Sequence, residues 1–436
     1  MYDVIIVGAG PAGLAAAHRL RDENLSLVVL EATDSIGGRT LSLPVGGLSS
    51  NTGALFIYRG TPAEEFAERF DVRTAPFRPD TFGVHVGGIT VVDTDNDRLV
   101  AALPISDEAK TDLREFIAAA LDEYGSAGRP EDATGLTDQK MGERIAPLHP
   151  EVREILSRAI QAGSVADPSV LSAQYALRYF ASYLAHEKEN RLYALDGMLA
   201  IPEGIYAELP EGTVRFGARV ASVVPKASDD ESAEPGYAVT LAGGETLKAR
   251  EVVLAVPSPV ALALVPGLPR EKRDAMEAVL MPGSTTLCVT VDASGLPEIA
   301  RWSFVATCDV AFDGMINPQP AAAGEQPDTV QFVCFGNSAG YRPDLMNDET
   351  AAKAWVSDFL RVAPELEGRV LGAHLQTWEH CFALLTPERA HALETLQQSV
   401  GSLHFAGDYT SATAGTHGAY GEGRRAAECA LARLSV

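Results

Sequence analysis

The segment that most constrains the fold lies at the start of the chain. Residues 2–7 (YDVIIV) are mostly apolar and rich in β-branched side chains, a pattern typical of a strand buried on both faces of a parallel sheet. A glycine-rich segment follows directly and contains Gly8, Gly10, Pro11, Ala12 and Gly13. Glycines at this spacing permit a tight turn, the approach of a pyrophosphate to backbone N–H groups, and close packing of a helix on the strand. Residues 14–20 continue in an alanine-rich helical pattern, so we predict a strand–turn–helix unit.

A second strand and an acidic residue complete this unit. Residues 25–30 read as a strand, and Glu31 and Ala32 follow them. A carboxylate at the end of the second strand suits the ribose hydroxyls of a dinucleotide and disfavours a 2′-phosphate. A glycine-rich turn alone is a weak signal, but here all the parts occur in register. The sequence therefore predicts an α/β fold with a Rossmann-type domain that binds a dinucleotide.

Size, charge and cysteine content narrow the class of protein. A chain of 436 residues exceeds the usual size of one domain, so we expect two. Its net charge of −24 argues against a nucleic acid or an anionic membrane as partner. The five cysteines are scattered and form no C-x-x-C pair, and no histidines stand at metal-ligand spacing, so we expect neither disulfides nor a metal site. With no leader segment before residue 2 and no apolar stretch long enough to span a bilayer, we expect a cytoplasmic protein.

Three further segments carry a resemblance to a known family: GGRT at 37–40, FAGDYTS at 405–411 and GAYGEG at 418–423. Together with the glycine-rich turn they resemble motifs of the flavin amine oxidases in the broad sense, which include monoamine, polyamine and L-amino-acid oxidases. The resemblance implies FAD as cofactor and a small molecule as substrate. It also implies a discontinuous FAD-binding domain (residues 1–60, 190–282 and 398–436) with an inserted substrate domain of mixed sheet and helices (residues 61–189 and 283–397). The oligomeric state stays open, with a homodimer as one option.

The same resemblance assigns cofactor contacts outside the glycine-rich turn. Arg39 would lie near the FAD pyrophosphate, and the backbone of Val220 would bond adenine. Gly407 and Asp408 would approach the ribityl chain and phosphate. A helix that begins near residue 420 would direct its positive N-terminal end at the flavin ring. The remaining expected contacts are Gly38, Thr40, Gly53, Ala54, Leu55, Gly418 and Ala419.

Near the flavin, the resemblance implies two aromatic side chains and a thiol. Tyr420 and Phe382 fall where amine oxidases place a pair of rings that holds the amine, although packing alone would also account for either ring. Cys381 falls where monoamine oxidases form a thioether with the flavin. The S-G-G-C-Y segment around that cysteine is absent here, so we expect non-covalent FAD and a buried, unreactive thiol, with the thioether as the alternative.

Two positions depart from the family pattern. In an ungapped placement, Leu287 stands where many amine oxidases carry a lysine that is linked through water to flavin N5. A register shifted by one or two residues is the alternative, but no lysine occurs between Lys272 and Lys353. This change argues against fast use of oxygen. Phe56 stands where L-amino-acid oxidases carry an arginine for the substrate carboxylate, with Arg59 as a nearby substitute.

These features predict an oxidoreductase that oxidises the C–N bond of a small amine by hydride transfer to flavin N5. Such chemistry depends on positioning and desolvation more than on acid–base side chains. The alternative is a flavin-dependent dehydrogenase, desaturase or isomerase of a non-amine substrate on the same fold.

Overall fold

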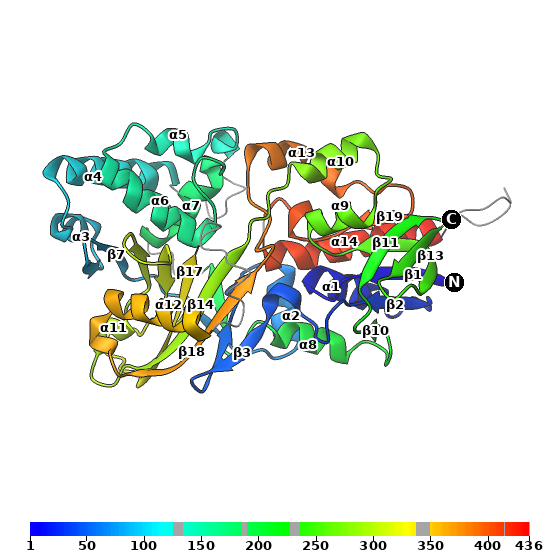
Figure 1. Ribbon diagram of the computed structural model, residues 1–436, viewed down its shortest axis with the longest axis horizontal. Helices are drawn as coiled ribbons and strands as arrows, with labels where there is room; N and C mark the ends of the chain where they lie inside the picture. The colour runs from blue at the N-terminus through cyan, green and yellow to red at the C-terminus, as the bar shows by residue number, and fades with distance from the viewer. Residues whose placement is uncertain (125–133, 185–189, 227–235, 337–348, 414, 436) are drawn as a thin grey trace.

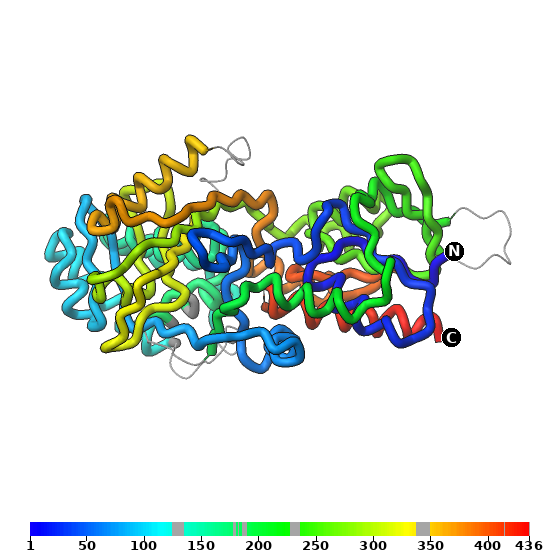
Figure 2. Tube along the Cα trace, turned by 90° about the horizontal axis from the view of Figure 1, so that it is seen from below, coloured from blue at the N-terminus to red at the C-terminus, as the bar shows by residue number. Residues whose placement is uncertain are grey.

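The computed structural model describes residues 1–124, 134–184, 190–226, 236–336, 349–413 and 415–435. Two large sheets, each covered by helices, follow one another along the long axis of the molecule (Figure 1). Both chain termini lie at the end that holds the first sheet, and a quarter turn of the molecule shows the same division (Figure 2). The predicted α/β class is confirmed.

The first sheet has seven strands in the order β10-β2-β1-β13-β12-β11, with β19 paired to β13. They are β1 (Tyr2–Val7), β2 (Leu27–Leu30), β10 (Val214–Arg215), β11 (Val220–Pro225), β12 (Tyr237–Leu241), β13 (Thr246–Leu254) and β19 (Leu403–Phe405). β1 pairs in parallel with β2 and β13. Val4 and Ile6 pack into one hydrophobic core, while Ile5 and Val7 pack into another. The sheet is therefore buried on both faces, as its apolar strands predict.

Helices cover both faces of this sheet. One face carries α1 (Pro11–Leu20), α2 (Pro62–Arg69), α8 (Ala200–Ala207) and α14 (Thr416–Leu434), and the other carries α9 (Ser258–Leu264), α10 (Arg270–Glu277) and α13 (Pro387–Gln397). The helices α1 and α14 approach closely, since a Cβ on Gly423 would lie 2.1 Å from the carbonyl oxygen of Ala12. None of the described helices combines the length and the apolar character that crossing a membrane requires.

The second sheet also has seven strands, in the order β18-β14-β17-β16-β15-β7-β8. They are β7 (Phe82–Val86), β8 (Ile89–Asp93), β14 (Ser284–Asp292), β15 (Phe304–Thr307), β16 (Gly314–Ile316), β17 (Thr329–Gly336) and β18 (Val370–Trp378). The helices α4 (Asp107–Tyr124), α6 (Pro150–Ser164) and α7 (Ala173–Leu184) share one core with this sheet, and α12 (Glu349–Val362) shares the other. The short helices are α3 (Asn96–Ala102), α5 (Met141–Ile145) and α11 (Pro297–Ala300).

Two small sheets join these parts. One is the hairpin of β3 (Ser42–Val45) and β4 (Leu48–Asn51), and the other has the order β5-β9-β6, from β5 (Phe56–Tyr58), β6 (Thr74–Pro76) and β9 (Arg191–Ala194). The hydroxyl of Thr290 in β14 donates to the carbonyl of Val45 at 2.8 Å, which fixes the hairpin on the second large sheet. β6 comes from the predicted substrate segment and β9 from the predicted FAD segment, so hydrogen bonds cross that expected boundary.

Candidate active site

The three glycines of the N-terminal turn meet different surroundings. A Cβ on Gly13 would lie 1.8 Å from the carbonyl oxygen of Gly8, and Gly8 itself has φ +102°. Packing and backbone geometry therefore require glycine at both positions. Gly10 has an ordinary extended backbone (φ −77°, ψ −176°), and a Cβ there would meet nothing within 4 Å. It precedes α1, whose N-terminus has no side-chain cap, so the space beside Gly10 suits a phosphate.

Glu31 lies beside this turn, directly after β2. Its Oε2 accepts a hydrogen bond from the N–H of Ala9 at 2.8 Å, and its Oε1 accepts one from the N–H of Thr33 at 2.9 Å. The N–H of Ala218 donates to the carbonyl oxygen of Glu31 at 2.7 Å, which brings the start of β11 and Val220 towards the turn. The residues expected at the adenosine part of a dinucleotide thus lie in one neighbourhood.

A cavity lies between the N-terminal ends of α1 and α14, which cover the first large sheet, and strands β14, β17 and β18 of the second large sheet. The predicted cofactor residues that line it are Pro11, Arg39, Thr40, Gly53, Ala54, Leu55, Asp408 and Ala419, and the predicted catalytic residues that line it are Cys381 and Phe382. The other lining residues are Phe56, Tyr58, Ala162, Gly163, Val165, Tyr175, Thr286, Phe335, Trp378, Gly415, Thr416 and His417. Its lining does not include Gly8, Gly10, Ala12, Gly13, Glu31, Ala32, Gly38, Val220, Gly407, Gly418, Leu287 or Tyr420. We call Phe56, Tyr58, Phe335, Trp378 and Phe382 the aromatic wall.

Arg39 and Asp408, which both line the cavity, form an ion pair. Arg39 donates to both carboxylate oxygens of Asp408, at 3.1 and 3.2 Å, and also to the carbonyl oxygen of Cys381 at 2.8 Å. The N–H of Ala383 donates to the same carboxylate at 2.9 Å. These bonds compensate the burial of Asp408 and bring three distant segments together. The two residues that the sequence assigns separately to FAD are therefore partners of each other.

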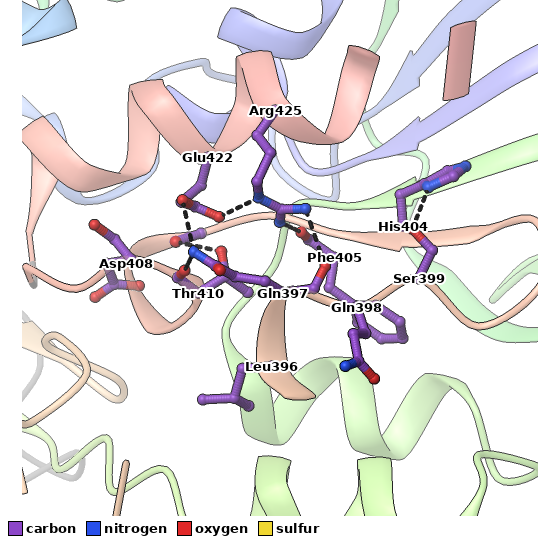
Figure 3. A network of polar contacts seen from close by, with 12 residues as sticks. Leu396, Gln397, Gln398, Ser399, His404, Phe405, Asp408, Thr410, Glu422 and Arg425 are labelled. Atoms are coloured by element: carbon purple, nitrogen blue, oxygen red, sulfur yellow. Dashed lines mark hydrogen bonds and ion pairs between the residues drawn. The ribbon is translucent and has the colours of Figure 1, made fainter. Parts of the chain in front are cut away.

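A second network holds the turn that carries Asp408 (Figure 3). Arg425 on α14 donates to Glu422 at 2.6 Å and to the carbonyl oxygens of Gln397 and Phe405. The side chain of Gln397 donates to the carbonyl oxygen of Thr410 at 2.9 Å. The network ties the ends of β19 and α13 to α14, so the turn between Phe405 and Thr410 is supported from both sides.

The structure places Tyr420 away from the cavity and corrects the expected pair of rings. Tyr420 is fully buried and packs against Phe66 of α2, with ring centroids 5.4 Å apart. Each residue turns an α-helix by about 100°, so Ala419 faces the cavity and Tyr420 faces the core. The ring that α14 contributes to the cavity is His417, which packs on Tyr58 with centroids 4.6 Å apart. Phe382 does line the cavity.

The placement of Leu287 also needs correction. Leu287 is fully buried in the core that β14 shares with α12, whereas the neighbouring Thr286 lines the cavity. Successive residues of a strand point to opposite faces, so an error of one position exchanges the two sides. The cavity-facing residue of β14 is a threonine, so the departure from the family lysine remains.

Cys381 and Arg59 have environments that limit what they can do. Burial raises the pKa of the Cys381 thiol to about 12, which disfavours the reactive thiolate.

Arg59 pairs with Glu64 at 3.2 Å, is half exposed and does not line the cavity, so it does not replace a carboxylate anchor there.

Sequence reasoning missed several cavity residues that follow from local periodicity. Tyr58 stands two residues after Phe56 on β5 and shares its face. Phe335 lies near the end of β17 and Trp378 at the end of β18, and both line the cavity. Trp378 Nε1 donates to the carbonyl oxygen of Thr52 at 2.9 Å.

Among the described residues, no group of three or more His, Cys, Asp or Glu side chains could hold a metal ion.

Comparison with known proteins identifies relatives along the whole chain. The family described as flavin containing amine oxidoreductase matches residues 11–431. Polyamine oxidase 2 from Arabidopsis thaliana is 23% identical over 98% of this chain and 87% of its own length. The structure of cyclohexylamine oxidase from Brevibacterium oxydans superimposes with a TM-score of 0.77 at 21% identity over both full chains, which establishes a shared fold.

A more local similarity is stronger. Amine oxidase B from Cavia porcellus is 58% identical over 41 residues, which are 9% of this chain and only 8% of that protein.

Proposed function

This chain belongs to the flavin-containing amine oxidoreductase family, and we propose that it is an FAD-dependent enzyme that oxidises the C–N bond of a small amine. The observation that carries the proposal is the cavity itself. Its lining joins expected cofactor residues, such as Arg39 and Ala54, to the aromatic wall. A redox cofactor and an apolar substrate could therefore share one cavity.

The residues present fit FAD. The space beside Gly10 and the uncapped N-terminus of α1 would accept the pyrophosphate, and Glu31 would accept hydrogen bonds from a ribose. The N-terminus of α14 lies at the cavity through Gly415 and Thr416, where it would stabilise negative charge. When bound, FAD supplies the acceptor for a hydride from the amine. The raised pKa of Cys381 supports non-covalent attachment.

The aromatic wall would select the neutral, deprotonated form of an amine. Arg39 and Asp408 neutralise each other, and the other described lining residues, apart from His417, carry no ionisable group that is charged at neutral pH. An ammonium ion would lose its hydration there without gaining a counter-ion. Rings and aliphatic groups would gain by burial at about 25 cal/mol per Å². We therefore propose cyclic or aromatic monoamines as the substrate class, ahead of diamines.

The runner-up is a dehydrogenase of a non-amine substrate with slow oxygen use. The observation that favours it is Thr286, the residue through which β14 lines the cavity, because it offers a neutral hydroxyl and no lysine is among the lining residues. The two functions differ in which compounds reduce the flavin.

Anaerobic flavin reduction tests the proposal. Cyclohexylamine and benzylamine should bleach the flavin absorbance, putrescine should do so more slowly, and cyclohexanol should have no effect. Bleaching by no amine would refute amine oxidation. Reoxidation in air at the rate of free reduced flavin would identify a dehydrogenase rather than an oxidase.

A further inference from the structure

Val165, which directly follows α6 and lines the cavity, has a backbone conformation that valine rarely adopts. Its φ and ψ are +61° and 10°, in the left-handed region, where a β-branched side chain crowds the neighbouring backbone. Glycine is the usual residue at such a helix end, because it has no Cβ. The other described residues besides glycine that have a positive φ, Asn24 and Asp71, are polar and exposed. Val165 is therefore an unusual residue for its conformation.

Hydrogen bonds fix the turn that contains Val165. The N–H of Val165 donates to the carbonyl oxygen of Gln161 at 2.7 Å, which closes the last turn of the helix. The hydroxyl of the buried Ser164 donates to the carbonyl oxygen of Ile160 at 2.6 Å. Neither bond uses the side chain of residue 165, so glycine could form the same turn without strain. The valine needs an explanation other than the turn.

Packing in a hydrophobic core does not provide that explanation. Val165 is only 4% exposed, yet it belongs to none of the core clusters that the described residues form. Its neighbour Ala166 is similarly buried, belongs to the core that α6 shares with the second sheet, and does not line the cavity. Two adjacent buried residues thus have different surroundings, and that of Val165 is the cavity.

The end of α6 lines the cavity on the side away from the expected cofactor residues. Ala162, Gly163 and Val165 line it from the helix that packs on the second sheet, whereas Pro11 and Ala419 line it from α1 and α14 on the first. These helices lie in opposite halves of the molecule along its long axis (Figure 1). A substrate whose reacting end faces the cofactor would therefore extend its other end towards α6.

We propose that Val165 determines substrate size: its isopropyl group limits the end of the substrate that lies away from the cofactor, and this role retains a strained valine where glycine would fit the backbone. The substrate consequence rests on the proposed amine oxidation, whereas the limit on ligand size does not. A hydrophobic pocket distinguishes ligands that differ by one methylene by about 10- to 200-fold. Removing the isopropyl group should therefore admit ligands that carry a further apolar substituent.

Binding of two matched neutral ligands tests this inference without any need for turnover. Benzamide and 4-isopropylbenzamide differ by one isopropyl group, which is also the group that Val165→Gly removes. Their dissociation constants from the FAD-loaded protein can be measured by calorimetry. The ratio of the dissociation constant of 4-isopropylbenzamide to that of benzamide should fall at least about tenfold in Val165→Gly relative to the unsubstituted protein. Val165→Ala, which removes two methyl groups and keeps the Cβ, should lower the ratio by less.

Two control variants separate the cavity from the fold. Ala166→Gly removes a methyl group from the adjacent core and should leave the ratio unchanged. Asp71→Gly introduces glycine at an exposed residue with φ +51°, so it relieves the same kind of backbone conformation and should also leave the ratio unchanged. An unchanged ratio in folded Val165→Gly, or a comparable fall in either control, would overturn the proposal.

Thermal unfolding tests the strain at residue 165. Glycine usually makes a protein less stable than alanine does, because it raises the entropy of the unfolded chain. Here the order should be reversed, with Val165→Gly unfolding about 1–2 °C above Val165→Ala, because only glycine adopts the left-handed conformation without crowding by a Cβ. A lower unfolding temperature for Val165→Gly than for Val165→Ala would show that the position is not strained and would refute that part of the proposal.

Oxidation supplies a second measure of the size limit. The ratio of kcat/KM for 4-isopropylbenzylamine to that for benzylamine should rise at least about tenfold in Val165→Gly. If no amine is oxidised by any variant while the binding ratio falls, the proposed function fails and the limit set by Val165 stands. If amines are oxidised but neither ratio shifts, the proposal for Val165 fails alone.

Discussion

Gly10→Ala should separate cofactor binding from folding. The backbone at Gly10 is extended and acceptable for alanine, and the new methyl group would meet no protein atom within 4 Å. As an N-cap, alanine stabilises the folded protein less than glycine does, by about 0.5–1 kcal/mol. Alanine also lowers the entropy of the unfolded chain, which stabilises the folded protein by about 0.4–1 kcal/mol. The free energy of unfolding of the apoprotein should therefore change by less than about 1 kcal/mol.

The same methyl group projects into the space that the pyrophosphate needs. A hydrogen bond between a backbone N–H and a charged group is worth about 1.5–3 kcal/mol. Losing one such bond would weaken FAD binding by about 10- to 150-fold. The assay is a titration of the apoprotein with FAD by calorimetry, paired with thermal unfolding of the same apoprotein.

Two other glycines provide controls. Gly13→Ala should destabilise the apoprotein itself, because its Cβ would lie 1.8 Å from the oxygen of Gly8. Gly243→Ala, where a Cβ would again meet nothing within 4 Å, should leave the affinity for FAD unchanged and raise the free energy of unfolding by at most about 1 kcal/mol. If Gly10→Ala binds FAD with unchanged affinity, the phosphate does not lie beside Gly10 and the assignment of the turn is wrong.

Three further outcomes follow from buried groups. Lys272→Met should lower the free energy of unfolding, measured in a denaturant titration, by about 2–4 kcal/mol. The reason is that Lys272 Nζ donates to three carbonyl oxygens at the end of α13. Lys248→Met, at an exposed lysine, is the control, and an equal loss of stability in both variants would contradict this reasoning. Tyr420→Phe should leave the free energy of unfolding and the rate of anaerobic flavin reduction unchanged, because the Tyr420 hydroxyl is buried without a hydrogen-bond partner among the described residues. Slower flavin reduction in this variant would show that Tyr420 belongs to the active site. Cys381 in the folded protein should react with iodoacetamide at pH 8 about a thousandfold more slowly than an ordinary thiol of pKa 9, because burial raises its pKa to about 12. Rapid alkylation seen by mass spectrometry, or yellow colour that stays with acid-precipitated protein, would count against an unreactive, unmodified thiol.

The features that sequence predicted well are those fixed by local chemistry. The turn at Gly8 to Gly13 could be recognised because only glycine tolerates the backbone conformation at Gly8 and the close contact at Gly13. Phe382 and Cys381, which the family resemblance assigns to the flavin although the S-G-G-C-Y segment is absent, both line the cavity.

The features that sequence missed depend on single-residue rotation or on distant partners. Thr286 rather than Leu287, and His417 rather than Tyr420, face the cavity because strands and helices turn each successive side chain to a new direction. The pairing of Arg39 with Asp408 joins residues 369 positions apart, and no local pattern reveals it.

The close packing of α1 against α14 has a consequence for how the protein is made. The turn and α1 emerge from the ribosome long before α14, because nearly all the other helices and strands lie between them in the sequence. Until α14 is synthesised, the face of α1 around Ala12 stays exposed to solvent. The cavity also lacks two of its lining residues, Thr416 and Ala419. Such long-range closure makes folding slow and leaves apolar surface exposed to chaperones in the meantime. A nascent chain that lacks α14 should therefore be unable to retain flavin, and capture of the cofactor would follow the synthesis of α14.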